Sequence, residues 1–211
     1  MVKGKLITIE GGEGAGKSTA LAFIKRYFLQ RQINCLFTRE PGGTEIAEQI
    51  RQLILHALSD ESVLPETELL LMFAARAQHI KTCILPALES GQFVVSDRYV
   101  DASYAYQGGG RGMDNQYITM LDKWIVGDVC PDLTLLFDID PVLGFERTKN
   151  RGASHDRIER EKIAFFKRVR ERYLERAQND RGRIKIIDAS QTVASVEKQL
   201  EAVLDAFMMT V

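Results

Sequence analysis

A glycine-rich string near the N-terminus constrains the fold of this 211-residue chain more than any other feature. The pattern GxxxxGK[ST] is matched by Gly11-Gly12-Glu13-Gly14-Ala15-Gly16-Lys17-Ser18. An apolar, strand-like run (6–10) precedes it, and a segment with helical spacing (19–29) follows it. Glycines allow positive φ, so consecutive N–H groups can point at phosphate oxygens, and the following helix adds its positive end. We therefore predict a phosphate cradle between a strand and a helix.

The residue types within the string indicate what the cradle binds. Lys17 reaches the β- and γ-phosphates of a nucleoside triphosphate, and the Ser18 hydroxyl binds Mg²⁺. The residues from Gly11 to Gly16, together with Thr19, are expected to contact the same nucleotide. The pattern predicts ATP or GTP with Mg²⁺, but it does not distinguish a kinase from a GTPase or a motor ATPase.

Strand-like and helix-like segments alternate along the rest of the chain. Five short apolar runs are expected to be strands: 6–10, 35–38, 93–97, 133–138 and 184–188. Most of them do not alternate with polar residues, which is typical of parallel strands covered on both faces. The intervening segments have helical periodicity, as in 44–58 and 193–207. The chain is therefore expected to form one α/β domain, 1–211, with a five-stranded parallel sheet and helices on both faces.

Two further features of this organisation are predicted. Pro65 suits the first turn of a long helix, which Pro86 should kink or terminate before Gly91. The polar, arginine-rich stretch 147–159 is expected to be a short lid inserted over the active edge of the sheet.

Composition excludes several classes of partner. The chain has 28 basic and 29 acidic side chains, without the basic excess of proteins that wrap nucleic acid or bind anionic membranes. It contains no apolar run of about 18 residues that could span a membrane. Cys35, Cys83 and Cys130 form no CxxC pair and are expected to be reduced thiols that fill core space. The first residues lead directly into a strand and leave no room for a signal peptide, so we expect a cytoplasmic protein.

The end of the third predicted strand favours a kinase. No NKxD segment reads guanine, and no DxxG follows this strand, which disfavours a GTPase. Asp97 ends the strand beside the cradle, where it suits a water-mediated contact to Mg²⁺. Arg98 follows it and places positive charge next to the γ-phosphate, where a second anionic substrate could bind. A surface ion pair between Asp97 and Arg98 is the alternative.

Several segments together carry a family resemblance. They are the cradle with Glu13 inside it, Thr38-Arg39-Glu40-Pro41-Gly42-Gly43-Thr44, Phe73-Ala74-Ala75-Arg76, Asp97-Arg98-Tyr99, Ala105-Tyr106-Gln107-Gly108-Gly109-Gly110-Arg111-Gly112 and Asp156-Arg157-Ile158-Glu159. In this order and spacing, over about residues 5–190, the chain resembles thymidylate kinases. The resemblance implies a P-loop NTPase fold, a homodimer, and transfer of the ATP γ-phosphate to dTMP. A related kinase for another nucleotide or a nucleoside, and a nucleotide-dependent ATPase switch, are the alternatives.

Residue chemistry agrees with a pyrimidine monophosphate substrate. Phe73 is placed to stack on the base, with a core side chain on an apolar helix as the alternative. Arg76 lies three residues on and can donate to thymine O4, where cytosine carries an amino group. Gln107 offers both a donor and an acceptor to the N3 edge, and Ser103 is expected to assist it.

The resemblance also suggests contacts to the sugar and phosphate of dTMP. Tyr104 or Tyr106 is expected to pack against the deoxyribose. In the family, an acid at the position of Glu13 accepts from the sugar 3′-hydroxyl. Arg98 is expected to hold the dTMP phosphate, with Arg39 as a further candidate or as a structural ion-pair partner of Glu40 or another acid.

The lid is expected to supply a catalytic arginine. Eukaryotic members carry an arginine within the cradle, whereas this chain has Gly14 after Glu13 and matches the bacterial type. In that type an arginine of the lid reaches the γ-phosphate. Arg151 is the first candidate and Arg157 the second, while Arg147 is expected to stack on the adenine.

The acceptor phosphate requires no general base, because near pH 7 it is mostly a dianion with a second pKa of about 6. Accordingly, His56, His79 and His155 are interpreted as surface or structural residues. Catalysis is expected to depend on positioning and on neutralisation of the moving phosphoryl group by Lys17, Arg98, Mg²⁺ and the lid arginines.

Overall fold

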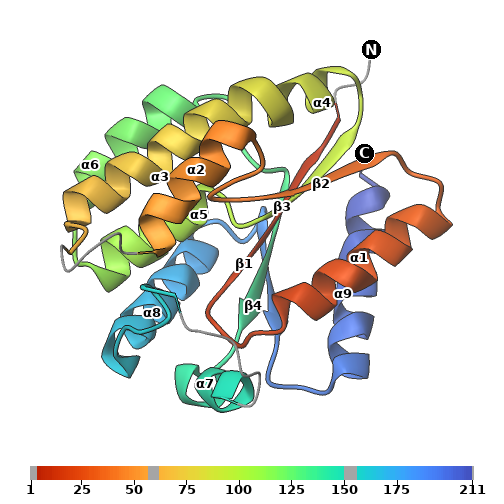
Figure 1. Ribbon diagram of the computed structural model, residues 1–211. Coiled ribbons are helices and arrows are strands. Elements are labelled where there is room, and N and C mark those ends of the chain that lie inside the picture. Colours follow the sequence, from red (N-terminus) through yellow and green to blue (C-terminus); the bar gives the residue numbers. More distant parts are fainter. Residues whose placement is uncertain (1–3, 57–61, 150–155, 211) are drawn as a thin grey trace.

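A parallel sheet between two layers of helices forms the core of the protein (Figure 1). The computed structural model describes residues 4–56, 62–149 and 156–210. The strands are β1 (Leu6–Gly11), β2 (Cys35–Arg39), β3 (Phe93–Asp97), β4 (Leu133–Asp138) and β5 (Ile184–Asp188). Their order is β2-β3-β1-β4-β5, and every neighbouring pair is parallel. The predicted five-stranded parallel sheet is thus confirmed, with each strand within one residue of its expected bounds.

The helices follow the strands in the alternation that the sequence predicts. They are α1 (Lys17–Gln30), α2 (Glu45–Leu55), α3 (Pro65–His79), α4 (Leu85–Glu89), α5 (Val100–Ser103), α6 (Asn115–Leu121), α7 (Pro141–Lys149), α8 (Ile163–Asn179) and α9 (Val193–Met208). Three π-helical segments extend α3, α5 and α6: η1 (Ile80–Ile84), η2 (Tyr104–Gly110) and η3 (Asp122–Val126). Among the described residues no helix is long and apolar enough to cross a membrane.

Of the two outcomes expected at Pro86, a kink or the end of the long helix, the second does not occur. The helical run that begins at Pro65 continues past Pro86. Pro86 lies in α4, and the π-helical turn η1 comes immediately before that helix. Leu85 donates its N–H to the carbonyl of Ile80 in this wider turn. The helical run then ends at Glu89, shortly before Gly91, whose φ of +79° suits glycine.

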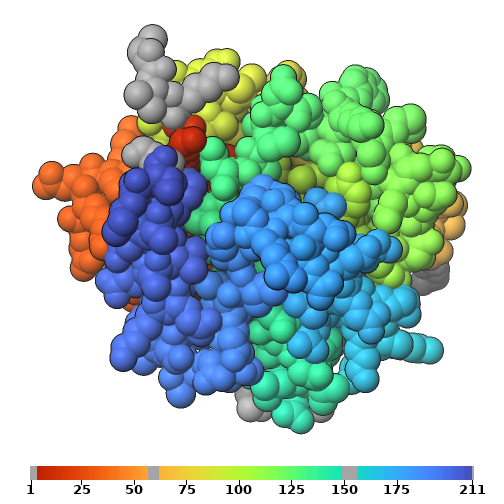
Figure 2. Space-filling view, turned by 180° about the vertical axis from the view of Figure 1, so that it is seen from behind, coloured from red at the N-terminus to blue at the C-terminus, as the bar shows by residue number. Residues whose placement is uncertain are grey.

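Alternation along β1 divides its side chains between the two helical layers. Ile7 and Ile9 face the core formed with α1 and α9. Leu6, on the opposite face, packs against the layer that contains α3, η1 and η2. Figure 2 views the molecule from behind and shows the blue C-terminal segments, which include α8 and α9, spread over much of the surface visible from there. Because both faces of β1 are covered, its carboxyl end is held rigidly where the glycine-rich string begins.

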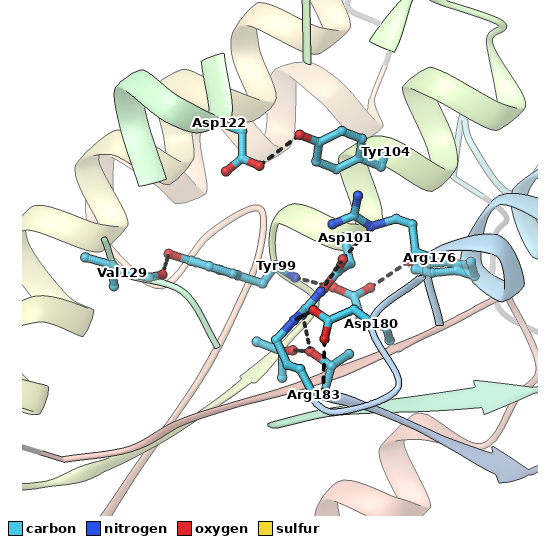
Figure 3. Close-up of polar contacts among 12 residues, drawn as sticks. Tyr99, Asp101, Tyr104, Asp122, Val129, Arg176, Asp180 and Arg183 are labelled. Atoms are coloured by element: carbon cyan, nitrogen blue, oxygen red, sulfur yellow. Dashed lines mark hydrogen bonds and ion pairs between the residues drawn. The ribbon is translucent and has the colours of Figure 1, made fainter. Parts of the chain in front are cut away.

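A buried polar network crosses the second face, between the sheet, α5 and α8 (Figure 3). Asp101 of α5 is 1% exposed. Its carboxylate accepts from Arg176 Nε at 2.5 Å and from Arg183 Nη1 at 2.6 Å. Burial would raise the pKa of Asp101, but the two arginines hold it below its ordinary value. The ionised Asp101 therefore ties α5 to α8 and to the turn that precedes β5.

Replacing Asp101 with asparagine is expected to lower the free energy of unfolding by about 3 kcal/mol, the lower end for a broken buried pair, because both arginines retain some solvent contact. Urea unfolding at pH 7 would measure this. Because the folded-state pKa is lowered, the contribution exists above the unfolded-state pKa and is lost as pH falls through the folded one. Glu175→Gln, which disrupts an exposed pair with Arg172, serves as control and should cost under about 0.5 kcal/mol. Equal losses in both variants would contradict this role.

Candidate active site

The loops after β1 and β3 meet at one edge of the sheet. The strands are neighbours, with Ile9 paired to Asp97, so both loops begin at the same level. The connection from β1 leads to β2, toward one edge strand of the sheet, and the connection from β3 leads to β4, in the opposite direction along the strand order. Open parallel sheets bind ligands in the crevice that forms where connections diverge in this way.

The glycine-rich string wraps into a compact loop before α1. Gly14 and Gly16 have φ values of +72° and +80°, a region that side chains rarely adopt. A Cβ on Gly14 would lie 2.0 Å from the carbonyl oxygen of Gly144. Glycine is thus required at Gly14 by both the backbone and the close approach of α7.

Lys17 is anchored inside this loop. Its ammonium donates to the carbonyls of Gly11 at 3.0 Å and Gly12 at 2.7 Å. Of its three N–H donors, one therefore remains for a ligand. Burial, followed by the nearby charge of Arg98, lowers the pKa of Lys17, although Glu13 counteracts this. A phosphate beside Lys17 would relieve the repulsion between Lys17 and Arg98.

Arg98 occupies an unusual backbone conformation at the end of β3, with φ +68°. A non-glycine residue there costs roughly 1 kcal/mol, so its surroundings must hold it. Its guanidinium donates to Glu13 Oε1 at 2.6 Å and to the carbonyl of Gly11 at 3.2 Å, and it lies 4.7 Å from the centre of the Tyr106 ring. Burial would raise the pKa of Glu13, but Arg98 and Lys17 outweigh it and lower that pKa. Glu13 is therefore an ionised acceptor beside the cradle.

Ser18 and Asp97 form a set of oxygen donors that fits Mg²⁺. Both line the cavity next to the cradle, which is called the main cavity because most of the predicted acceptor residues also border it. Within the described part of the chain, the buried Oδ1 of Asp97 has no hydrogen-bond partner. A carboxylate and a hydroxyl, completed by water and nucleotide oxygens, match the preference of Mg²⁺ for oxygen ligands. The residues present thus fit the predicted ion.

The main cavity, of about 230 Å³, extends from the cradle to a polar far end. Its lining includes these residues at the cradle end: Glu13, Gly14, Ala15, Gly16, Lys17, Ser18, Asp97, Arg98. Arg76, Ser103 and Gln107 line the cavity too, and Tyr106 borders it near Glu13. The structure therefore brings together most of the residues that the sequence predicts to bind the acceptor.

Arg76 is only 2% exposed, and hydrogen bonds to neighbouring groups hold its guanidinium in place. Its Nε donates to Glu40 at 2.7 Å, and its two terminal nitrogens donate to Ser103 Oγ and the Tyr99 carbonyl, both at 3.0 Å. Each terminal nitrogen keeps a second N–H. Glu40 also contacts the fully buried His79 at 3.1 Å, so His79 is a structural residue.

Two predicted substrate residues lie elsewhere. Phe73 packs in the core and does not border the main cavity; its ring lies 4.6 Å from the Arg76 guanidinium carbon. The structure places it behind Arg76, and Met72 borders the cavity instead. The hydroxyl of Tyr104 donates to Asp122 at 2.9 Å, outside the residues that line the cavity (Figure 3). Of the two tyrosine candidates, only Tyr106 borders the cavity.

Two predicted arginines contact other groups, and a third lies outside the described residues. Arg39 pairs with Glu48 at 2.9 Å, and its side chain is 54% exposed. Arg157 donates to the carbonyl of Ile54 at 2.9 Å and to the carboxylate of Glu68, so its guanidinium is held by these two groups. Arg151 lies outside the described residues, together with the rest of 150–155 in the middle of the predicted lid.

A second cavity, of about 350 Å³, lies on the other side of the cradle. Gly14, Gly16 and Thr19 line it together with Arg147 and the start of α9. Arg147 donates to the carbonyls of Ala189 at 2.7 Å and Ser190 at 3.0 Å. Its guanidinium is thereby held at the wall of a cavity that adjoins the phosphate-binding loop.

Sequence reasoning did not assign several residues of the main cavity to the site, among them Leu55, Met72, Arg51 and Glu40. Met72 could have been found, because it lies four residues before Arg76 on the same helix face, as Phe73 lies three before it. Arg51 donates to the Pro41 carbonyl at 2.9 Å. Burial and the nearby charges of Arg39 and Arg98 lower the pKa of Arg51, and both Arg51 and Arg98 line the cavity. Only the folded chain brings α2 to this place.

Glu10, directly before the cradle, is buried yet makes no ion pair with another of the described residues. Its carboxyl group accepts from Tyr99 N at 2.7 Å and from Tyr173 OH at 2.6 Å. Burial and the charge of Asp101 raise the pKa of Glu10 to about 8. Together with Ser96, which donates to the Arg98 carbonyl at 2.7 Å, it fixes the backbone on both sides of the strained Arg98 peptide.

The raised pKa of Glu10 predicts a pH-dependent stability. Because the folded-state pKa lies above the unfolded one, its contribution is complete below about pH 4.5 and is lost as pH rises toward 8. Glu10→Gln keeps the shape but cannot ionise. Between pH 5.5 and 8.5 the free energy of unfolding of the variant should therefore rise by at least about 1 kcal/mol relative to that of the parent chain, which is equivalent to about one pKa unit. Urea unfolding at both values measures this; parallel pH profiles would rule out a titrating Glu10.

The fold, the cradle and the acidic strand end beside it define a P-loop nucleotide-binding enzyme whose polar main cavity begins at the cradle. The family model described as Thymidylate kinase matches residues 9–200. The thymidylate kinase of Ruthia magnifica subsp. Calyptogena magnifica is 52% identical over 204 residues, 97% of this chain and 98% of the relative. That of Marinomonas sp. (strain MWYL1) is 51% identical over 200 residues, 95% of this chain and 93% of the relative.

A solved structure agrees with the sequence relatives. The crystal structure of thymidylate kinase from Ehrlichia chaffeensis is 29% identical and has a TM-score of 0.77, covering 96% of this chain and 99% of that chain. The chain therefore belongs to the thymidylate kinase family.

Proposed function

We propose that this chain transfers the γ-phosphate of ATP to dTMP, giving dTDP and ADP. One observation carries the proposal: a continuous cavity leads from Lys17 and Ser18 of the cradle to the fixed donors of Arg76. An acceptor in it would place an anionic group near Arg98 and a hydrogen-bonding ring at the far end. Membership of the thymidylate kinase family supports the same assignment.

The far end of the cavity is suited to thymine. Arg76 keeps free N–H donors for the O4 carbonyl, a position where cytosine presents an amino group. Gln107 is assigned to the N3 edge with Ser103 beside it. We assign the packing contact with the ring to Met72 and Leu55, because both border the cavity and Phe73 does not.

The other end is suited to a phosphate dianion. We assign Arg98 and Arg51 to the dTMP phosphate, with Arg39 as an outer positive charge beyond its pair with Glu48. Glu13, ionised and close to Arg98, is assigned as the acceptor for the sugar 3′-hydroxyl. Tyr106 is assigned to the deoxyribose, since it lies against both of these side chains.

Catalysis in this site needs no general base. The attacking dTMP oxygen already carries negative charge, so positioning and charge stabilisation suffice. Lys17 and the loop N–H groups hold the phosphates of ATP, and Ser18 and Asp97 would hold Mg²⁺, which neutralises phosphate charge when bound. A nucleoside acceptor would require a base, and the lowered pKa of Glu13 makes it a poor one. Arg147 is assigned to the adenine in the second cavity.

We retain Arg151 as the first candidate for the lid arginine that contacts the γ-phosphate. Arg157 is the weaker candidate because Glu68 and the Ile54 carbonyl bind its guanidinium. Arg151→Ala should lower kcat by about 10³-fold while changing the KM for dTMP little, as expected of a contact made in the transition state. Steady-state kinetics with both substrates varied would measure this. If kcat fell in Arg157→Ala but not in Arg151→Ala, the role would pass to Arg157.

The assembly and location are proposed as well. We infer a homodimer from the family resemblance. It is supported by the exposed apolar side chains of Leu70 on α3, Tyr117 and Met120 on α6, and Trp124 on η3, since α3 packs against η3. We place the reaction in the cytoplasm, in keeping with the free thiols of Cys35, Cys83 and Cys130. Cys130 is exposed, so the prediction that it fills core space is wrong.

Base discrimination by Arg76 tests the proposed function. Arg76→Ala should reduce the ratio of kcat/KM for dTMP to that for dCMP by about 10- to 100-fold, the loss expected for one charged hydrogen bond. The KM for ATP should not change. An unaltered dTMP-to-dCMP ratio would remove Arg76 from base recognition and with it the proposed orientation of the substrate.

A further inference from the structure

Glu68 is a buried carboxylate of α3 that the proposed mechanism does not use. It is 1% exposed, and its hydrogen-bond donors among the described residues lie outside α3. Gln107 Nε2 donates to its Oε1 at 2.8 Å, and Arg111 Nη2 donates to its Oε2 at 3.0 Å. Arg157 also donates to Oε2, and Arg111 Nε lies 3.3 Å from Oε1.

The charge state of Glu68 follows from these partners. Burial would raise the pKa of Glu68, but Arg111, Gln107 and Arg157 outweigh it and lower that pKa. An ionised carboxylate only accepts hydrogen bonds. The Gln107 side chain must therefore turn its NH₂ group toward Glu68 and its carbonyl oxygen away from it, whatever orientation the amide would adopt alone.

The geometry points to Glu68 as a positioning residue that sets the polarity of Gln107 and thereby selects the base, an inference that rests on the proposed dTMP site. Gln107 lines the main cavity beside Arg76 and Ser103. With its amide fixed, it presents an acceptor to the substrate. Thymine N3 carries a hydrogen and can donate to that acceptor, whereas cytosine N3 is itself an acceptor and is repelled.

The isosteric change Glu68→Gln reverses this polarity for a specific reason. Two arginines donate to the Oε2 position, whereas Oε1 receives Gln107 and a longer contact of 3.3 Å from Arg111 Nε, so the new amide oxygen is favoured at Oε2 and the new NH₂ group faces Gln107. Gln107 then turns its own oxygen toward residue 68 and offers a donor to the cavity. Glu68→Asp is the matched control, because it shortens the side chain but still only accepts hydrogen bonds.

The test compares kcat/KM for dTMP and dCMP in both variants, with melting temperatures and the KM for ATP recorded alongside. Glu68→Gln should lower the dTMP-to-dCMP ratio by about 10- to 100-fold, while Glu68→Asp should keep the ratio within about threefold. A role in packing alone predicts the reverse order, since the shorter aspartate disturbs packing more, and that order would overturn the inference. If Glu68→Gln does not fold, a fall of more than about threefold in the dTMP-to-dCMP ratio for Glu68→Asp would still overturn the inference.

A double variant separates this inference from the proposed base site. Gln107→Leu should lower the ratio by itself, and adding Glu68→Gln should then have no further effect on it. A further drop in the double variant would show that Glu68 acts through another group and would overturn the inference alone. No change in the ratio for Gln107→Leu would overturn both the base assignment and the role of Glu68.

Discussion

Lys17→Ala is expected to lower kcat by about 10³-fold, the typical effect of removing one preorganised donor to developing charge. Lys17 is the only side chain of the string that can carry a positive charge to the phosphates of ATP. Its ammonium is held by the carbonyls of Gly11 and Gly12, so no reorganisation is needed when the phosphoryl group moves. Coupled measurement of ADP release with saturating ATP and dTMP gives the value.

Lys17→Arg provides the matched control for this prediction. It keeps the positive charge, but its larger planar group does not fit between the two loop carbonyls, so kcat should also fall strongly. Thermal unfolding should show that both variants fold. Turnover near the parent value in Lys17→Ala would contradict the assignment of the cradle.

Arg98→Ala is expected to lower kcat/KM for dTMP by a similar factor, about 10³-fold. Unlike Lys17, Arg98 lies between the cradle and the acceptor cavity, where it contacts Glu13 and the ring of Tyr106. Its loss should raise the KM for dTMP and lower kcat together, and should leave the KM for ATP nearly unchanged. Initial rates with each substrate varied in turn distinguish these effects.

Arg98→Lys separates charge from geometry. Lysine restores the charge but not the two-pronged contact that a guanidinium makes with a phosphate, so it should recover only part of the activity. Arg98→Ala should also lower the free energy of unfolding, because it removes the hydrogen bonds to Glu13 and the Gly11 carbonyl, so thermal unfolding is recorded beside the kinetics. A rise in the KM for ATP alone would move Arg98 from the acceptor to the nucleotide.

Local signals in the sequence predicted the sheet and the cradle well. The strands are short apolar runs, and the pattern from Gly11 to Ser18 carries its own geometry, because glycine is needed where φ is positive. Asp97 and Arg98 were identified because Asp97 ends a strand and Arg98 directly follows it, and the carboxyl end of that strand must lie at the active edge. All of these inferences depend on residues close together in the chain.

Side-chain direction could not be predicted in the same way. Phe73 and Met72 are adjacent on α3 and both lie near Arg76 by helical spacing, yet only Met72 borders the cavity. Tyr104 and Tyr106 belong to a π-helical segment, whose wider turn changes the side-chain directions that an α-helical pattern implies. The deciding factor in both cases is the packing of neighbouring elements.

Long-range ion pairs were the least predictable part of the site. Arg157 appeared suited to the phosphates because it lies in a basic stretch, but Glu68, 89 residues away, binds it in the structure. Arg51 of α2 reaches the cavity because its helix packs on α3. Neither contact leaves a signal in the spacing of the residues concerned.

The most direct test of the central claim is ADP release from ATP and Mg²⁺ with dTMP, dUMP, dCMP, dGMP or thymidine as the only acceptor. The cavity of Arg76, Gln107 and Arg98 predicts strong turnover with dTMP, less with dUMP, and little with the other three. Turnover with thymidine or dCMP above that with dTMP would contradict the assigned acceptor site while leaving the cradle intact, and ADP release independent of every acceptor would contradict the kinase itself.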